Sequence, residues 1–91
     1  MLLTIDIGNT NISFGVYQGE KIKSSWRVST EQHRMPDEYG LQIEGLLKHA
    51  DFSPGDISGI CLASVVPPLT DVLIEACREY LFQEPLVVTQ A

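Results

Sequence analysis

The chain of 91 residues is long enough for one small domain, and its 44% hydrophobic and 20% charged residues are typical of a globular protein. Twelve acidic residues against six basic ones give a formal net charge of −6, which repels nucleic-acid backbones and anionic membrane surfaces. This charge disfavours a nucleic-acid-binding protein, and no apolar run approaches the roughly 20 residues that span a bilayer.

The start of the chain, its cysteines and its histidines indicate an ordinary cytoplasmic protein. Residues 1–7 carry an acid and no base, so the basic region of a secretory signal is absent and we expect a cytoplasmic location. Cys61 and Cys77 stand in apolar stretches without the spacing of a metal site, which favours buried, reduced thiols. His33 and His49 have no second ligand nearby, so we expect both at the surface.

Three strands are predicted first along the chain. Residues 1–7 and 11–17 are short runs rich in β-branched and aromatic residues, and the Gly-Asn-Thr stretch between them can turn tightly, which predicts a hairpin. The Gln18-Gly19 pair predicts a second two-residue turn. Residues 21–29 alternate between the two faces of a strand, which predicts a third, half-exposed strand at the edge of the sheet.

The period of the apolar residues changes to that of a helix after residue 35. Pro36 suits a first helical turn, and Asp37 and Glu38 suit the positive end of the helix dipole. The apolar stripe of this predicted helix consists of Tyr39, Ile43, Leu46, Leu47 and Ala50. Residues 57–66 follow as an almost continuously apolar run of small residues, which is typical of a parallel strand covered on both faces.

A second helix and a last strand complete the pattern. Pro67 and Pro68 open the helix. The turn from Val65 to Pro68 could either shape a pocket or simply start this helix, and the second role needs no ligand. The apolar stripe of this helix consists of Leu69, Val72, Leu73, Ala76 and Tyr80. Residues 85–88 begin another strand.

The order of these elements, βββαβαβ, predicts an α/β fold. Strands joined by tight turns form an antiparallel meander, whereas a strand reached through a helix lies parallel on a right-handed crossover. The result is a mixed sheet with helices on its faces and the first strand at its centre, which is the pattern of a ribonuclease-H-like half-domain. Because the chain closes just after the last predicted strand, we expect residues 1–91 to be a fragment, an N-terminal half-domain without its second half.

The stretch DIGNTN, Asp6 to Asn11, is the candidate site. A carboxylate between Ile5 and Ile7 of a central strand is expected to need a cation or hydrogen-bond donors, because burial penalises its charge. Gly8 allows close approach of a ligand to the backbone, and a turn of N–H groups can bind an anion. The same residues also suit a hairpin without any ligand, and their spacing alone does not decide between the two interpretations.

Three stretches resemble type III pantothenate kinases, of the sugar kinase, heat-shock ATPase and actin superfamily. DIGNTNISFGVY is similar to the first phosphate motif of the superfamily, in the form with Gly-Asn-Thr. WRVSTEQHRMPDEYG resembles the family's Trp-Arg, Ser-Thr and Arg-Thr-x-Asp-Glu-Tyr segment, with Met35 where threonine is usual. ASVVPPLT resembles its Ser-Val-Val-Pro signature. The matches run over most of the chain in the family's order.

The resemblance implies an enzyme that phosphorylates pantothenate to 4'-phosphopantothenate with ATP, the first step of coenzyme A biosynthesis. It implies a homodimer that needs Mg²⁺ and a monovalent cation, K⁺ or NH₄⁺. The residues expected to line the nucleotide phosphates are Asp6, Ile7, Gly8, Asn9, Thr10, Asn11, Ile12 and Ser13. Asp6 is also expected to hold the Mg²⁺ through water. Ser13 departs from residues often found at its position, including lysine.

The resemblance places the catalytic base outside this chain. The family's Gly-x-Asp-Arg motif, which binds pantothenate and supplies the base, is expected beyond Ala91, so residues 1–91 alone are expected to be inactive. For Trp26 and Arg27, the alternation of an edge strand is favoured over a role in the site. Two alternative functions remain, another kinase or ATPase of the superfamily and a non-catalytic regulatory or accessory protein of the same fold.

Overall fold

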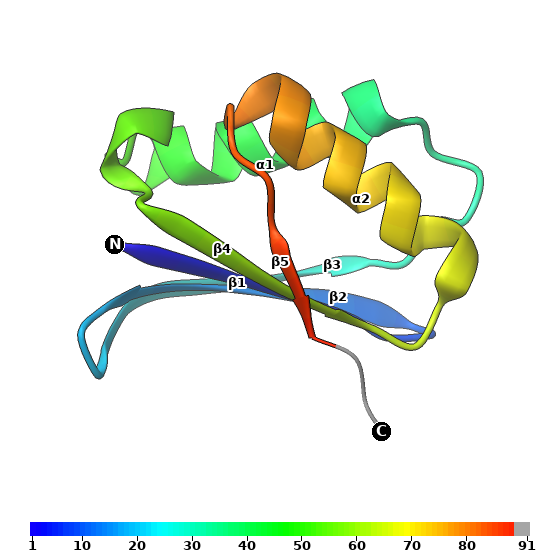
Figure 1. Ribbon diagram of the computed structural model, residues 1–91, viewed down its shortest axis with the longest axis horizontal. Coiled ribbons are helices and arrows are strands. Elements are labelled where there is room, and N and C mark those ends of the chain that lie inside the picture. Colours follow the sequence, from blue (N-terminus) through cyan, green and yellow to red (C-terminus); the bar gives the residue numbers. More distant parts are fainter. Residues whose placement is uncertain (89–91) are drawn as a thin grey trace.

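The computed structural model describes residues 1–88 as a five-stranded mixed sheet with both helices on one face (Figure 1). The elements are β1 (Leu2–Ile7), β2 (Asn11–Gln18), β3 (Lys21–Ser29), α1 (Pro36–His49), a 3₁₀ turn η1 (Pro54–Asp56), β4 (Gly59–Ser64), α2 (Pro67–Tyr80) and β5 (Leu86–Val88). The strand order is β3-β2-β1-β4-β5, with β2 antiparallel to both neighbours and β4 parallel to both of its own. The predicted order of elements, the mixed sheet and the edge position of β3 are confirmed.

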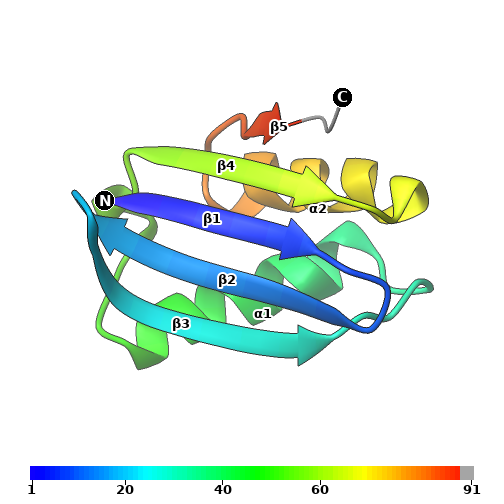
Figure 2. The same cartoon turned by 90° about the horizontal axis from the view of Figure 1, so that it is seen from below.

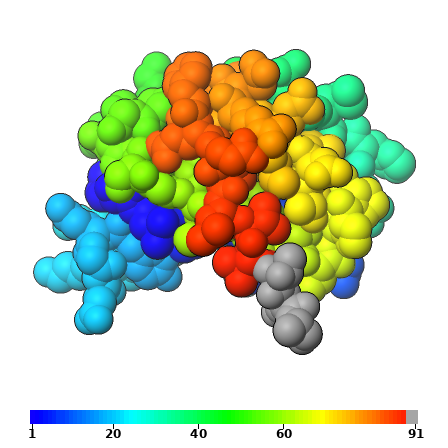
Figure 3. All heavy atoms as spheres, in the orientation of Figure 1, coloured from blue at the N-terminus to red at the C-terminus, as the bar shows by residue number. Residues whose placement is uncertain are grey.

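The turn between β2 and β3 differs from the predicted one by a residue. The strands end and resume at Gln18 and Lys21, so Gly19 and Glu20 form the turn. Gly19 has φ +61°, a left-handed conformation. Glycine adopts this conformation at little cost because it has no Cβ. The turn therefore forms around the glycine, and it projects from the body of the molecule (Figure 3).

The strand β4 is shorter than predicted and is covered on one face only. Its Ile60 and Leu62 are buried towards the helices, whereas Gly59, Cys61 and Ala63 are half-buried on the other face. The expectation of cover on both faces is wrong for these residues, because α1 and α2 lie on the same side of the sheet (Figure 2). We call the side without helices the open face.

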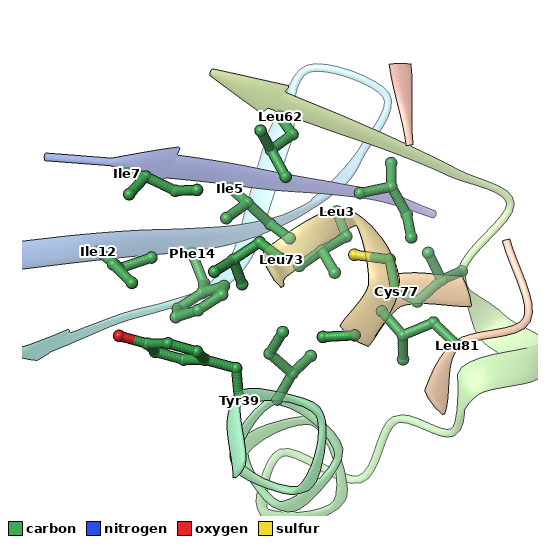
Figure 4. Packing of buried hydrophobic residues seen from close by; sticks show 14 of the residues in the cluster. Leu3, Ile5, Ile7, Ile12, Phe14, Tyr39, Leu62, Leu73, Cys77 and Leu81 are labelled. Atoms are coloured by element: carbon green, nitrogen blue, oxygen red, sulfur yellow. The ribbon is translucent and has the colours of Figure 1, made fainter. Parts of the chain in front are cut away.

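The core lies between the sheet and the two helices (Figure 4). Alternate residues of β1 and β2, among them Ile5 and Phe14, meet Tyr39 from α1 and Leu73 from α2, and all four side chains are buried. Burying an aliphatic side chain of this size contributes about 1.5–3 kcal/mol, so these stripes hold the helices to the sheet. No helix among residues 1–88 is long and apolar enough to span a membrane.

The predicted positions of Cys77 and of both histidines are confirmed, whereas the predicted burial of Cys61 is wrong. Cys77 is fully buried in α2, and this burial, with a smaller effect of the Glu84 charge, raises the pKa of its thiol to about 12. Cys61 is only half-buried, on the open face, and both cysteines are free thiols. His33 and His49 are exposed.

Candidate functional site

The candidate loop joins β1 to β2 at the carboxyl end of the central strand. Asn9 and Thr10 at its tip are exposed, and the Gly8 N–H donates to the Asn11 carbonyl at 2.9 Å. The chain leaves β1 towards β2 on one side, whereas it leaves the parallel neighbour β4 towards β5 on the other (Figure 2). Ligands of open α/β sheets bind outside the carboxyl ends of strands at such a divergence. The fold thus puts the loop where a ligand is expected.

Asp6 lies on the open face and is exposed, which corrects the expectation from the sequence. Ile5 and Ile7 point into the core, and the two-residue period of the strand turns Asp6 away from it. The hypothesis that burial forces a partner on this carboxylate is therefore wrong. Asp6 pairs in register with Ser13 of β2 and with Ala63 of β4, so it lies on the central strand, two residues before the loop begins at Gly8.

The predicted site residues divide into those whose side chains reach the open face or the loop and those whose side chains do not. Asp6, Asn9, Thr10 and Asn11 are exposed, and Gly8 and Ser13 are half-buried. Ile7 and Ile12 are fully buried, and their side chains point into the core (Figure 4). These two residues can contribute only main-chain groups to a ligand site.

The start of α2 offers few donors to an anion. Proline occupies the first two helical positions, Pro67 and Pro68, and proline has no N–H. The Ser64 Oγ accepts the Val66 N–H at 3.0 Å, and the Val65 N–H donates to the Ile7 carbonyl at 3.0 Å. The ASVVPPLT stretch thus starts the helix and ties the end of β4 to the end of β1, which leaves the β1–β2 loop as the source of main-chain donors.

An open hollow of about 330 Å³ lies beside the site, across β2 and β3. Its lining includes Ser13, Ser25 and the exposed Arg27, and Arg27 pairs in register with Ser13. Within residues 1–88 the one ion pair joins Arg78 and Glu84, so the Arg27 guanidinium keeps its charge free for an anion. The alternation of β3 predicts the outward position of Arg27, but its place next to Ser13 depends on the strand register.

Sequence reasoning missed the contact of Thr30 with the loop. The Thr30 hydroxyl donates to the Gly8 carbonyl at 2.7 Å, and the Thr30 N–H donates to the Thr10 carbonyl at 2.9 Å. The sequence shows only that Thr30 follows the third strand; the contact itself depends on the register by which β3 returns along the hairpin.

A metal ion would find little support from the protein alone. Within residues 1–88, no three histidine, cysteine, aspartate or glutamate side chains gather at one point. Mg²⁺ keeps several waters and takes one or two carboxylates together with substrate phosphates. The single exposed carboxylate of Asp6 fits an ion that arrives with a nucleotide, and it does not fit a cage made by the protein.

Comparisons with known proteins agree with the resemblance in sequence. The family model of type III pantothenate kinase matches residues 2–91. The type III pantothenate kinase of Roseiflexus sp. (strain RS-1) is 50% identical over 88 residues, which are 97% of this chain and 34% of the relative. That of Thermomicrobium roseum is 45% identical over 91 residues, all of this chain and 35% of the relative. The chain thus spans about a third of the length of these relatives.

The fold of this chain is similar to part of a solved kinase structure. The crystal structure of a ROK hexokinase from Thermus thermophilus superposes with a TM-score of 0.68 at 17% identity, over 96% of this chain and 34% of that one. The chain thus shares with that hexokinase the fold of a mixed sheet with a loop after its first strand. By the family match over residues 2–91, the chain belongs to the type III pantothenate kinase family.

Proposed function

We propose that residues 1–91 form the phosphate-holding half-domain of a kinase that transfers the γ-phosphoryl group of ATP to pantothenate and yields 4'-phosphopantothenate. The observation that carries this proposal is the family match over residues 2–91, with the DIGNTN loop at the carboxyl end of the central strand. The relatives are about three times as long, which supports a second half-domain in a longer protein. We call that longer protein the full-length protein.

The division of labour within this kinase follows from the chemistry of phosphoryl transfer. Catalysis depends mainly on positioning and charge stabilisation, and a carboxylate helps to accept the proton of the attacking hydroxyl. Asp6, Gly8 to Asn11 and Ser13 hold the phosphates of ATP. The sequence contains no Gly-x-Asp-Arg, so the base and the pantothenate pocket come from outside residues 1–91, and these residues alone are inactive.

The cofactors and partners of the proposed kinase follow from the family. Mg²⁺ neutralises charge on the ATP phosphates, and Asp6 holds it through water, as its exposed position allows. The active form also binds a monovalent cation, K⁺ or NH₄⁺. The full-length protein is a homodimer. It works in the cytoplasm. The net charge of −6 supports a protein that does not bind nucleic acid.

The test is transfer of labelled γ-phosphate from ATP to pantothenate by the full-length protein with Mg²⁺ and K⁺. We expect 4'-phosphopantothenate from the full-length protein and none from residues 1–91 under the same conditions. Label transferred to another acceptor would instead make the protein a different kinase of the superfamily. ATP binding without any transfer would favour a regulatory protein.

A further inference from the structure

Thr30, the first residue after β3, contacts the candidate loop at both of its ends. The hydroxyl donates to the Gly8 carbonyl at 2.7 Å, and the N–H donates to the Thr10 carbonyl at 2.9 Å. Gly8 lies 22 residues before Thr30 in the sequence, so only the return of β3 along the hairpin brings the two together. These bonds determine which way the peptide units of the loop face.

One consequence concerns the bond that usually closes a two-residue hairpin. The residues flanking such a turn, here Gly8 and Asn11, usually exchange two N–H···O=C bonds. Only the bond from the Gly8 N–H to the Asn11 carbonyl forms, at 2.9 Å. Within the described part of the chain the reciprocal bond is absent, and the Gly8 carbonyl is turned towards the Thr30 hydroxyl, from which it accepts. The Asn11 N–H is therefore left for another acceptor.

A second consequence concerns the direction of the N–H groups. All described peptide bonds are trans, and in a trans peptide the C=O and the following N–H point in opposite directions. With the carbonyls of Gly8 and Thr10 turned towards Thr30, the N–H groups of Asn9 and Asn11 turn away from it. Successive main-chain N–H groups of a turn can form a concavity that binds an anion.

We propose that Thr30 is a positioning residue, which holds the loop open so that the Asn9 and Asn11 N–H groups donate to a phosphate of ATP. The proposal rests on the function proposed above, because it takes the loop as the phosphate site. Thr30 itself points to the other side of the loop and does not touch the nucleotide.

The segment that carries Thr30 is in turn fixed by helix α1. The hydroxyl of Tyr39, a fully buried residue, accepts the Glu31 N–H at 2.9 Å and donates to the Glu31 carbonyl at 2.8 Å. Because both the N–H and the carbonyl of Glu31 are hydrogen-bonded, the main chain next to Thr30 has little freedom to move. The support for the loop therefore extends from the core through Tyr39 and Glu31 to Thr30.

The test compares three variants. Thr30→Val keeps the shape of the side chain and removes its hydroxyl, and Thr30→Ser keeps the hydroxyl. Thr4→Val is the matched control, because the Thr4 hydroxyl also donates to a carbonyl, that of Gly15 at 3.4 Å, away from the loop. The ATP dissociation constant and KM are measured on the full-length protein, and amide hydrogen exchange on residues 1–91.

We expect Thr30→Val to raise the dissociation constant and the KM for ATP about tenfold, with the KM for pantothenate unchanged, as the loss of well-placed hydrogen bonds predicts. Thr30→Ser is expected within threefold of the wild type, and Thr4→Val within twofold. Without ligand, the Asn11 amide is expected to exchange rapidly in the wild type and at least tenfold more slowly in Thr30→Val, because the released Gly8 carbonyl can then accept it.

An ATP dissociation constant of Thr30→Val within twofold of the wild type would overturn the proposal. So would a wild-type Asn11 amide that is already protected without ligand, a measurement that needs no variant to fold. A full-length protein that binds ATP but leaves pantothenate unphosphorylated would contradict the proposed function alone, since the dissociation constants would still report on Thr30. Wild-type protein that binds no ATP would overturn both.

Discussion

Asp6 is the residue whose charge matters most to the proposed chemistry. Its carboxylate is exposed on the open face, so Asp6→Asn should leave the fold intact. In the full-length protein we expect kcat/KM to fall about a hundredfold, roughly 3 kcal/mol, because in the proposed function this carboxylate orients a metal ion beside the phosphates. The matched control is Asp51→Asn, in a left-handed conformation (φ 64°) that asparagine adopts readily. Turnover of Asp6→Asn within threefold of the wild type would end the assignment.

Met35 is a departure from the family pattern that the structure explains as a missing helix cap. It is the N-cap of α1, with extended φ and ψ of −85° and 162°, and its N–H already donates to the Glu38 carboxylate at 3.0 Å. Met35→Thr would add the hydroxyl of a capping box, and we expect about 1 kcal/mol of stabilisation in urea unfolding. Met35→Val is the control, because valine has the branched shape of threonine but lacks its hydroxyl. Equal stability of the two variants would contradict this account.

The residues of the site show what a sequence can and cannot predict. The turn chemistry of Gly8, Asn9 and Thr10 is local, and it predicted the loop correctly. The exposure of Asp6 follows from strand alternation, which the sequence also contains, but the interpretation as a buried charge gave the apolar neighbours too much weight. The bond from Thr30 to Gly8 depends on strand register across the sheet, and no local pattern contains it.

At the scale of elements, periodicity predicted both helices and the order of helices and strands along the chain. Tyr39 and Ile43 of α1 are buried as the stripe requires. The run of small apolar residues from 57 to 66 predicted that β4 is covered on both faces, but in the structure the helices cover only one. Small residues such as Ala63 are tolerated both in a core and on a half-covered face, so composition alone could not separate the two cases.

The contact between α1 and α2 predicts how substitution of a glycine in α1 changes the stability of the fold. A Cβ added at Gly40 of α1 would lie 2.1 Å from the Tyr80 ring of α2, which is held by a 2.8 Å bond from its hydroxyl to Asp37. Gly40→Ala should therefore destabilise the fold by about 1–3 kcal/mol through overpacking. Gly45→Ala, in the same helix with open space around it, should stabilise by about 0.5–1 kcal/mol. Thermal unfolding of both variants checks the opposite signs, and a stabilised Gly40→Ala would contradict the packing.

At the scale of the whole molecule, the loop receives support from one side only. Thr30 and the sheet hold it on one side, while Asn9 and Thr10 at its tip are exposed. A nucleotide bound there would make only part of the contacts that a closed cleft supplies. We therefore expect residues 1–91 to bind ATP weakly, with a dissociation constant of about 1 mM, near 4 kcal/mol.

The most direct test of the phosphate-binding loop is a titration of ¹⁵N-labelled residues 1–91 with ATP and Mg²⁺, followed by the amide signals of each residue. We expect saturable shifts confined to residues 6–13 and Thr30, largest at Asn9 and Asn11, with a dissociation constant of about 1 mM. Inorganic tripolyphosphate, which carries the phosphates without the nucleoside, should shift the same residues. Shifts that cluster elsewhere in the chain, or no shifts up to about 10 mM ATP in a folded chain, would contradict phosphate binding by the β1–β2 loop.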